Sequence, residues 1–118
     1  MISKSDIPGR LRAILALIDG MLEETHGQAF DHIAGNFLYE RAVERVIELI
    51  DEAAEPLPAA LGARYPAEEL APALTLADKL LDNDYRIDTY DLWQLLTKQF
   101  PALRLRVVEL LADFDFEI

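Results

Sequence analysis

The chain of 118 residues contains no cysteine, and this absence excludes several kinds of site at once. Disulfide bonds, zinc sites built on thiolates and thiol nucleophiles all require that residue. Serine is nearly as scarce, with only Ser3 and Ser5, and the sequence has no glycine-rich loop of the kind that binds phosphate. The sequence therefore offers few candidate nucleophiles for a Ser/His/Asp catalytic triad.

Long apolar runs are also missing. The longest span only a few residues, which is too short for a segment that crosses a bilayer. The first ten residues, MISKSDIPGR, lack the apolar stretch of a secretory signal peptide. We therefore expect a cytoplasmic protein that does not associate with membranes.

Basic residues are in short supply. Eleven Lys and Arg stand against 22 Asp and Glu, which gives a net charge of −11. A surface of this sign repels the phosphate backbone of a nucleic acid. Nucleic acid is therefore not an expected partner, although acidity alone does not say what the partner is.

Leucine and alanine are abundant, with 20 and 16 copies, whereas valine occurs only four times. This balance favours helix over sheet. The sequence shows no internal repeat, low-complexity tract or linker. We predict an all-α protein, an up-and-down bundle of four to five helices, with residues 1–118 forming a single domain.

The first helix is predicted to begin near residues 5–8 and to stop at Gly27. A connector over residues 28–35 follows and is expected to carry Phe30 and Ile33 inward. The apolar residues of this helix recur at the spacing of one buried face: Ile7, Leu11, Ile14, Leu15, Ile18, Met21 and Leu22.

The second helix is predicted over residues 36–57, followed by a turn over residues 58–66 that is punctuated by proline and glycine. Its apolar face is broad, which suggests packing against two neighbours, or against one neighbour and a second subunit. The main stripe comprises Leu38, Ala42, Val46, Leu49, Ala53 and Leu57, and Val43, Ile47 and Ile50 widen it.

A third helix is predicted over residues 68–81, with Pro72 in its first turn. Asp88 is expected to cap a fourth helix, which Pro101 breaks or kinks. Short loops between long helices favour antiparallel neighbours. The third helix's apolar stripe comprises Leu70, Leu74, Ala77 and Leu81.

Four carboxylates near the end of the third helix are candidates for binding a hard cation. Asp78 and Asp82 are four residues apart, and Asp84 and Asp88 follow. The alternating ligands and central glycine of a calcium loop are missing, and like charges at this spacing repel one another. We interpret these residues as a solvated acidic helix end.

Two further residue groups are interpreted as structural. His26 and His32 are six residues apart, whereas two metal ligands on one helix face need a spacing of three or four. Trp93 lies near Tyr85 and Tyr90 in sequence, and we expect it to serve packing or an interface. We therefore predict no metal ion and no cofactor.

One long segment carries a family resemblance. Residues 40–58, ERAVERVIELIDEAAEPLP, resemble the second helix of HepT-like proteins of the HEPN superfamily. The likeness extends over roughly residues 7–112 without a gap between Pro66 and Asp88. The ordered matches that carry it are Tyr65–Pro66, Ile87–Asp88, Leu92–Trp93 and Phe100–Pro101.

The resemblance implies a small helical bundle that forms a two-fold dimer. Members of the family typically act as RNase toxins beside a minimal nucleotidyltransferase antitoxin. Their site has an Arg, then a His four to six residues later, and a Tyr two residues after the His. The Arg stabilises charge on the phosphate and the His moves a proton. The dimer brings two such sets into one cleft.

This sequence departs from the family at that motif. In the gapless register the Arg, His and Tyr positions are occupied by Ala77, Asp82 and Asp84. A register shifted by one residue gives Asp78, Asn83 and Tyr85 and recovers only the tyrosine. We therefore expect no catalytic residue at the motif positions.

Two functional hypotheses follow, and a purely structural subunit of a larger assembly is a third possibility that the sequence does not separate from the first. The first is a catalytically inactive, dimeric protein-interaction module related to toxin–antitoxin systems, with a nucleotidyltransferase-type protein as a possible partner. The second is an active RNase with a non-standard site. Arg41 and Arg45 are its closest basic pair, but beside Glu40, Glu44 and Glu48 they are better interpreted as a salt-bridged surface.

Overall fold

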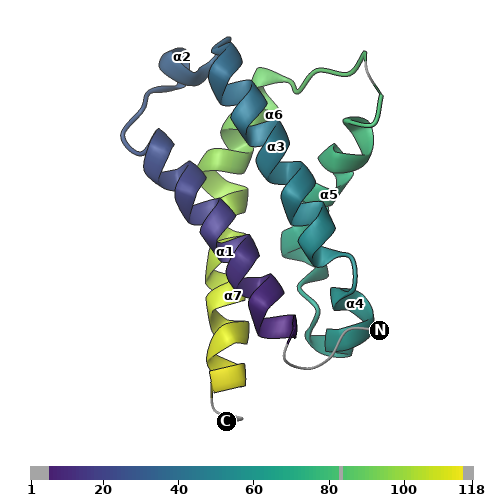
Figure 1. Cartoon of the computed structure of the whole chain (residues 1–118). Helices are drawn as coiled ribbons and strands as arrows, with labels where there is room; N and C mark the ends of the chain where they lie inside the picture. Colours follow the sequence, from purple (N-terminus) through teal and green to yellow (C-terminus); the bar gives the residue numbers. More distant parts are fainter. Residues whose placement is uncertain (1–5, 83, 116–118) are drawn as a thin grey trace.

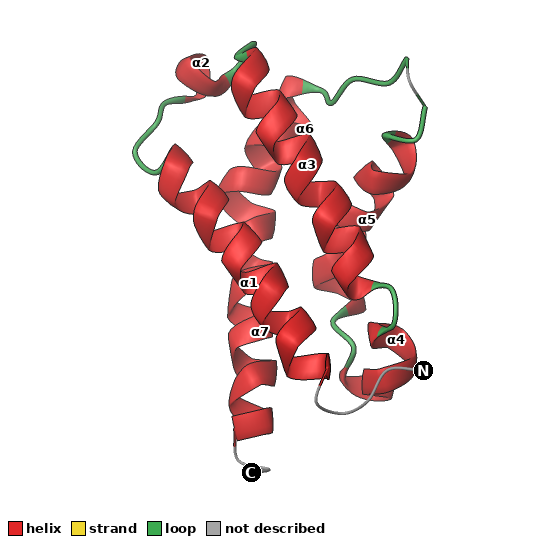
Figure 2. Ribbon diagram, viewed as in Figure 1, coloured by secondary structure: helices red, strands yellow, loops and turns green. Residues whose placement is uncertain are grey.

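Four helical limbs run alternately up and down in the computed structural model of the protein, which describes residues 6–82 and 84–115 (Figure 1). The limbs are α1 (Asp6–Thr25), α3 (Phe37–Ala54), α5 (Ala67–Lys79) and a last limb of three segments. That limb comprises α6 (Thr89–Gln94), a π-helical turn (Leu95–Gln99) and α7 (Phe100–Asp115). Figure 2 shows no strand in the described part of the chain. The predicted all-α, up-and-down bundle is confirmed.

The connections contain short helices that the sequence pattern does not predict. The connector after Gly27 forms one helical turn, α2 (Phe30–Ile33), and residues 58–66 are mostly helical rather than an open turn. The latter stretch contains most of α4 (Leu57–Leu61) and a 3₁₀ turn (Gly62–Arg64). Gly27 and Gly62 have φ of +75° and +56°, a conformation that favours glycine.

The connector buries one of the two residues expected to point inward. Ile33 is buried in the core, but Phe30 is 40% exposed, so that part of the prediction is wrong. The Phe30 ring lies edge-on to Trp93, with 5.4 Å between ring centroids and 87° between planes. Phe30 therefore packs at the edge of the bundle, where one side of its ring remains in solvent.

Helix α3 packs between α1 and α5, which resolves the alternatives for its broad apolar face in favour of two neighbours within the chain. Its buried line runs through Val43, Ile47 and Ile50, all fully buried. The predicted main stripe is wrong at Leu38, which is 76% exposed, and at Ala42, which is also exposed. Leu38 precedes Val43 by five residues, about 140° around a helix of 3.6 residues per turn, and so lies on the opposite side.

The third limb also differs from its prediction at both ends. Helix α5 begins at Ala67, so Pro72 lies in its second turn, where the ring removes one backbone hydrogen bond. It ends at Lys79, and Leu81 beyond that end is 83% exposed instead of lying on the buried stripe. Leu70, Leu76 and the other core residues close the space between the limbs.

Pro101 perturbs the last limb without ending it. The Phe100 N–H donates to the Leu95 carbonyl across five residues, which is the spacing of a π turn. Proline has no N–H and its ring crowds the carbonyl four residues before it, so the preceding turn widens. The helix then continues through α7 to Asp115.

Two arginines form polar contacts between helices. Arg10 of α1 donates to the Glu52 and Ala53 carbonyls at 3.2 and 3.3 Å, where the negative end of the α3 dipole favours a cation. Arg104 of α7 reaches Asp19 of α1 at 2.6 Å.

Among the described residues, no helix combines the length and the apolar character needed to span a membrane.

We expect the N-cap of α3 to contribute measurably to the fold. The Asn36 side chain accepts from the backbone N–H groups of Leu38 and Tyr39. An Asn36→Ala variant should lose about 1 kcal/mol of unfolding free energy in urea titration, because these N–H groups lose their acceptor. Asn36→Asp keeps an acceptor and serves as the control; equal losses in the two variants would contradict a capping role.

Candidate functional site

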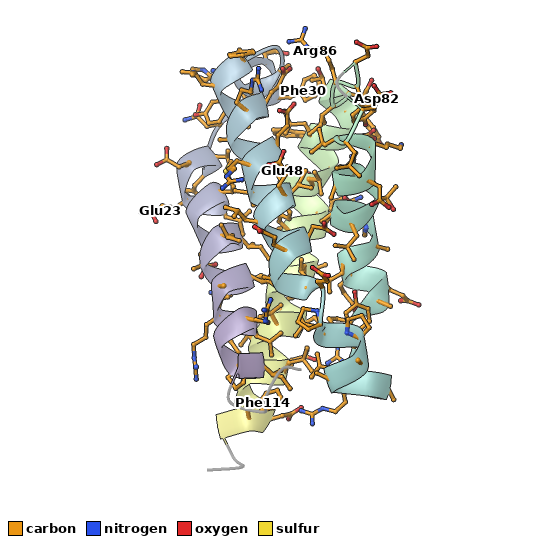
Figure 3. The ribbon with its side chains drawn as sticks, turned by 45° about the vertical axis from the view of Figure 1, so that its right-hand side comes forward. Glu23, Phe30, Glu48, Asp82, Arg86 and Phe114 are labelled. Atoms are coloured by element: carbon orange, nitrogen blue, oxygen red, sulfur yellow. The ribbon has the colours of Figure 1, made fainter. Side chains whose placement is uncertain are left out.

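A cleft of about 490 Å³ opens between α3 and the segment that joins α5 to α6. One wall is the N-terminal part of α3, and the other is formed by residues at and just beyond the end of α5. Asp82 and Arg86 lie at the end of the bundle away from Phe114, and Glu48 lies on α3 below them (Figure 3). The cleft is lined by Phe37, Glu40, Arg41, Glu44, Glu48, Leu80, Asp82, Asp84, Tyr85 and Arg86.

Carboxylates outnumber cations in this acidic cleft. Five carboxyl groups and two guanidinium groups line it, a balance of −3. The Arg41 guanidinium lies 3.8 Å from the Glu44 carboxylate and 5.0 Å from the centroid of the Phe37 ring. One of the two cations is therefore already held against the α3 wall, which leaves Arg86 as the cation of the opposite wall.

Two aspartates of the loop have local structural roles. The Asp82 carboxylate accepts from the Asp84 N–H at 2.9 Å and shapes the turn that carries both residues. The Asp88 carboxylate accepts from the Tyr90 N–H at 2.8 Å and caps α6, as predicted. These bonds fix the direction of the loop at the mouth of the cleft.

Tyr85 supplies a half-buried phenol to the cleft. Burial raises its pKa above the ordinary value of 10.0, and the carboxylates of Asp91 and Asp88 raise the pKa further. The Lys79 ammonium lies 5.8 Å from the centroid of its ring. The phenol is therefore held neutral, as a hydrogen-bond donor rather than a base.

The structure describes five of the six motif positions and separates them into two groups; Asn83 lies outside the described residues. Asp82, Asp84 and Tyr85 line the cleft, whereas Ala77 and Asp78 do not. Ala77 is only 7% exposed and belongs to the core. In either register, the position where the family has its arginine therefore contributes no group to the cleft of this chain.

The histidines and two of the aromatic residues singled out from the sequence, Trp93 and Tyr90, lie outside the cleft. His26 and His32 are exposed at the ends of helices, and neither lines the cleft. Trp93 packs against the core and Phe30, in accord with its predicted packing role, and Tyr90 is exposed. Within residues 7–82 and 84–114, no group of three or more His, Asp or Glu is arranged to hold a metal ion.

The α3 wall is the part of the site that the sequence interpretation missed. Glu40, Glu44 and Glu48 recur every four residues, and this spacing could have shown that they share a face. The expected ion pairs exist, because Arg41 pairs with Glu44 and Arg45 pairs with Glu48 at 3.4 Å. The sequence does not show that this face looks across a cleft at Asp82 and Asp84.

The titration of Tyr85 should report the charge of the loop. An Asp91→Asn variant is expected to lower the Tyr85 pKa, because a negative charge that opposes the phenolate is gone. The Tyr85 pKa is measured from the tyrosinate absorbance during alkaline titration, and the Tyr85→Phe variant identifies the part of the signal that belongs to Tyr85. The pKa of Tyr85 is higher in the folded chain than in the unfolded chain. Its contribution to the free energy of unfolding is therefore fully present below pH 10 and is lost as the pH rises through the folded pKa.

The matched control for this titration is Asp51→Asn. Asp51 raises the pKa of Tyr65, after burial as the larger cause, and is not a cause of the Tyr85 shift. The control should move the Tyr65 signal and leave that of Tyr85 in place. A Tyr85 pKa unchanged by Asp91→Asn would contradict the electrostatic explanation.

Comparison with known proteins supports the same resemblance. A family model described as "Ribonuclease HepT-like" matches residues 12–110. Two proteins of Methanocaldococcus jannaschii, each named "Putative RNase", are 23% identical over 112 residues, which is 95% of this chain and 93% and 97% of theirs. One of Caldanaerobacter subterraneus subsp. tengcongensis with the same kind of name is 27% identical over 104 residues, 86% of this chain and 90% of its own. No solved structure matches the chain. Because the family model covers most of its length, the chain belongs to the HepT-like family.

Proposed function

We propose that this chain is a HepT-like domain that does not cleave RNA and acts by binding proteins. The observation that carries the proposal is the composition of the cleft at the motif positions. In the gapless register of the resemblance, Asp82 and Asp84 occupy the His and Tyr positions of the family motif. Both line the cleft, whereas Ala77, at the Arg position, is buried away from it. Neither an imidazole nor a guanidinium is present at these positions.

The chemistry of RNA cleavage explains why these exchanges remove activity. Negative charge builds on the phosphate in the transition state, and a cation placed there stabilises it. Ionised carboxylates at that place oppose both the approach of the phosphate and the development of charge. The Asp82 carboxylate could accept a proton, but it already accepts the Asp84 N–H and has no imidazole to return a proton to the leaving oxygen.

A second candidate function is an RNase with a different set of residues. It is favoured by one observation: Arg41 and Arg86 line the same cleft as Asp82 and Tyr85. A guanidinium could contact the phosphate while a carboxylate takes the proton. Arg45, the other basic residue considered from the sequence, does not line the cleft and pairs with Glu48.

A cleavage assay separates the two candidates. The purified chain is incubated with fluorescently labelled single-stranded RNA, and we expect no cleavage above the protein-free blank, because the cleft carries a net negative charge. Cleavage that is lost in Arg41→Ala or Arg86→Ala but kept in Arg45→Ala would overturn the proposal in favour of the second candidate. The Arg45→Ala control removes an arginine of the same helix that lies outside the cleft.

We include a homodimer in this proposal, with the outer face of α7 as its surface. Leu105 is 64% exposed and Val108, three residues later, is exposed on the same side. Neighbouring charges are already compensated, because Arg104 pairs with Asp19 and Arg106 pairs with Glu109 at 3.3 Å. A second copy could cover these side chains without meeting the acidic cleft, which lies between α3 and the segment that joins α5 to α6.

Light scattering coupled to size-exclusion chromatography tests the dimer. The expected mass is twice the 13.3 kDa of the chain. Leu105→Glu should shift it towards the monomer, since the variant places a charge in an apolar contact. Leu38→Glu is the control, because Leu38 is a similarly exposed leucine on α3. A dimer that Leu38→Glu dissociates and Leu105→Glu leaves intact would show that the copies meet at the cleft instead.

The proposed partner is a small nucleotidyltransferase-type protein, supported by membership of the HepT-like family and by the resemblance that suggested it. Tagged protein expressed in its native host should recover such a protein by affinity purification and mass spectrometry. Recovery of the bait alone, as a self-associated dimer, would contradict this part of the proposal and favour a structural subunit.

A further inference from the structure

The geometry points to the end of the bundle around the acidic cleft as a docking surface for a basic, amphipathic segment of a partner protein. This inference rests on the proposed function, because it names the kind of partner segment that the protein-binding domain would take. It concerns a surface formed by the exposed face of α3, the mouth of the cleft and two exposed leucines beside it.

The first support is an unpartnered helix face. Phe37, Glu40, Glu44 and Glu48 recur at helical spacing along one side of α3 and line the cleft instead of packing against another limb. Glu48 lies eleven positions after Phe37, which corresponds to about 17 Å along the helix at a rise of 1.5 Å per residue. A helical segment of about three turns has the same length.

The second support is apolar surface at the rim. Leu38 follows the cleft residue Phe37, and Leu81 lies between the cleft residues Leu80 and Asp82. These two leucines have the largest exposed fractions among the described large apolar side chains, and Phe37 is half exposed. Exposed apolar side chains bordered by polar residues are typical of a surface that another protein covers.

The net charge of the cleft indicates which kind of segment would bind there. The cleft carries five carboxylates against two guanidiniums, so a segment rich in Lys or Arg is attracted and a phosphate backbone is repelled. A second copy would bring an equally acidic cleft against this one, and like charges facing each other across an interface oppose association. A basic segment of a different protein is therefore the occupant that complements this surface.

Two cations of the chain itself contact the aromatic rings of the cleft, and one of them, Lys79, lies outside its lining. The Arg41 guanidinium lies over the Phe37 ring at 5.0 Å, and the Lys79 ammonium lies over the Tyr85 ring at 5.8 Å. Both rings belong to cleft residues, one on each wall. Aromatic faces beside carboxylates favour side chains that combine a positive charge with an apolar stem, as Arg and Lys do.

The test uses a defined peptide and the full chain. A fluorescein-labelled helical peptide of about three turns carries four arginines along one face and leucines beside them, and anisotropy gives its dissociation constant at low and high salt. We expect binding that weakens as salt rises, because much of it is electrostatic. A peptide with glutamates in place of the arginines should not bind.

A matched pair of double variants locates the surface. Glu40→Gln with Asp84→Asn removes one carboxylate from each wall, and neither residue makes an ion pair within the described part of the chain. Asp51→Asn with Glu52→Gln makes the same two chemical changes at exposed positions of α3 outside the cleft. The cleft variant should weaken binding of the arginine peptide by about tenfold, and the control by less than about twofold.

Three results would overturn the inference: no binding of the arginine peptide at millimolar protein, equal effects of the two double variants, or tighter binding of single-stranded RNA than of the peptide. The cleavage assay is read separately. Absence of both peptide binding and RNA cleavage refutes the docking surface alone, whereas cleavage that depends on Arg41 or Arg86 refutes the proposed function.

Discussion

The burial of α3 between two neighbours is the constraint on which the rest of the molecule depends. Val43, Ile47 and Ile50 are fully buried between α1 and α5, and each contributes about 1.5–3 kcal/mol by leaving water. The exposed Arg41–Glu44 and Arg45–Glu48 pairs contribute at most about 1 kcal/mol each. Apolar packing therefore sets the rotation of α3, and that rotation directs its row of glutamates towards the cleft.

The loop after α5 supplies the opposite wall, and local hydrogen bonds fix its direction. Asp82 accepts from the Asp84 N–H, and Asp88 caps α6. These bonds place Asp82 and Asp84 across from the glutamates of α3, so carboxylates from two separate elements meet in one cleft. The cleft of this HepT-like chain therefore carries net negative charge, whereas the transition state of RNA cleavage is stabilised by positive charge beside the phosphate. The proposed loss of RNA cleavage rests on this negative charge.

The sequence predicts the limbs well because helical periodicity and capping are local signals. The stop at Gly27, the cap at Asp88 and the order of the four limbs all follow from such signals. The helical spacing of Leu38 and Leu81 predicts that both are buried, but burial depends on which helix lies opposite, and that is a tertiary property. Three of the cleft-lining residues were predictable from the family resemblance: Asp82, Asp84 and Tyr85. The α3 wall was not, since no local signal shows that Glu40, Glu44 and Glu48 face these residues.

We propose that the acidic cleft repels RNA in this member of the HepT-like family. The most direct measurement is an NMR titration of the isotope-labelled chain with a short single-stranded RNA, in which the backbone amides of residues 80–88 and of the first half of α3 are followed. We expect these resonances to stay in place and the RNA to remain intact throughout. Shifts confined to the amides around the cleft, accompanied by shortening of the RNA, would contradict it.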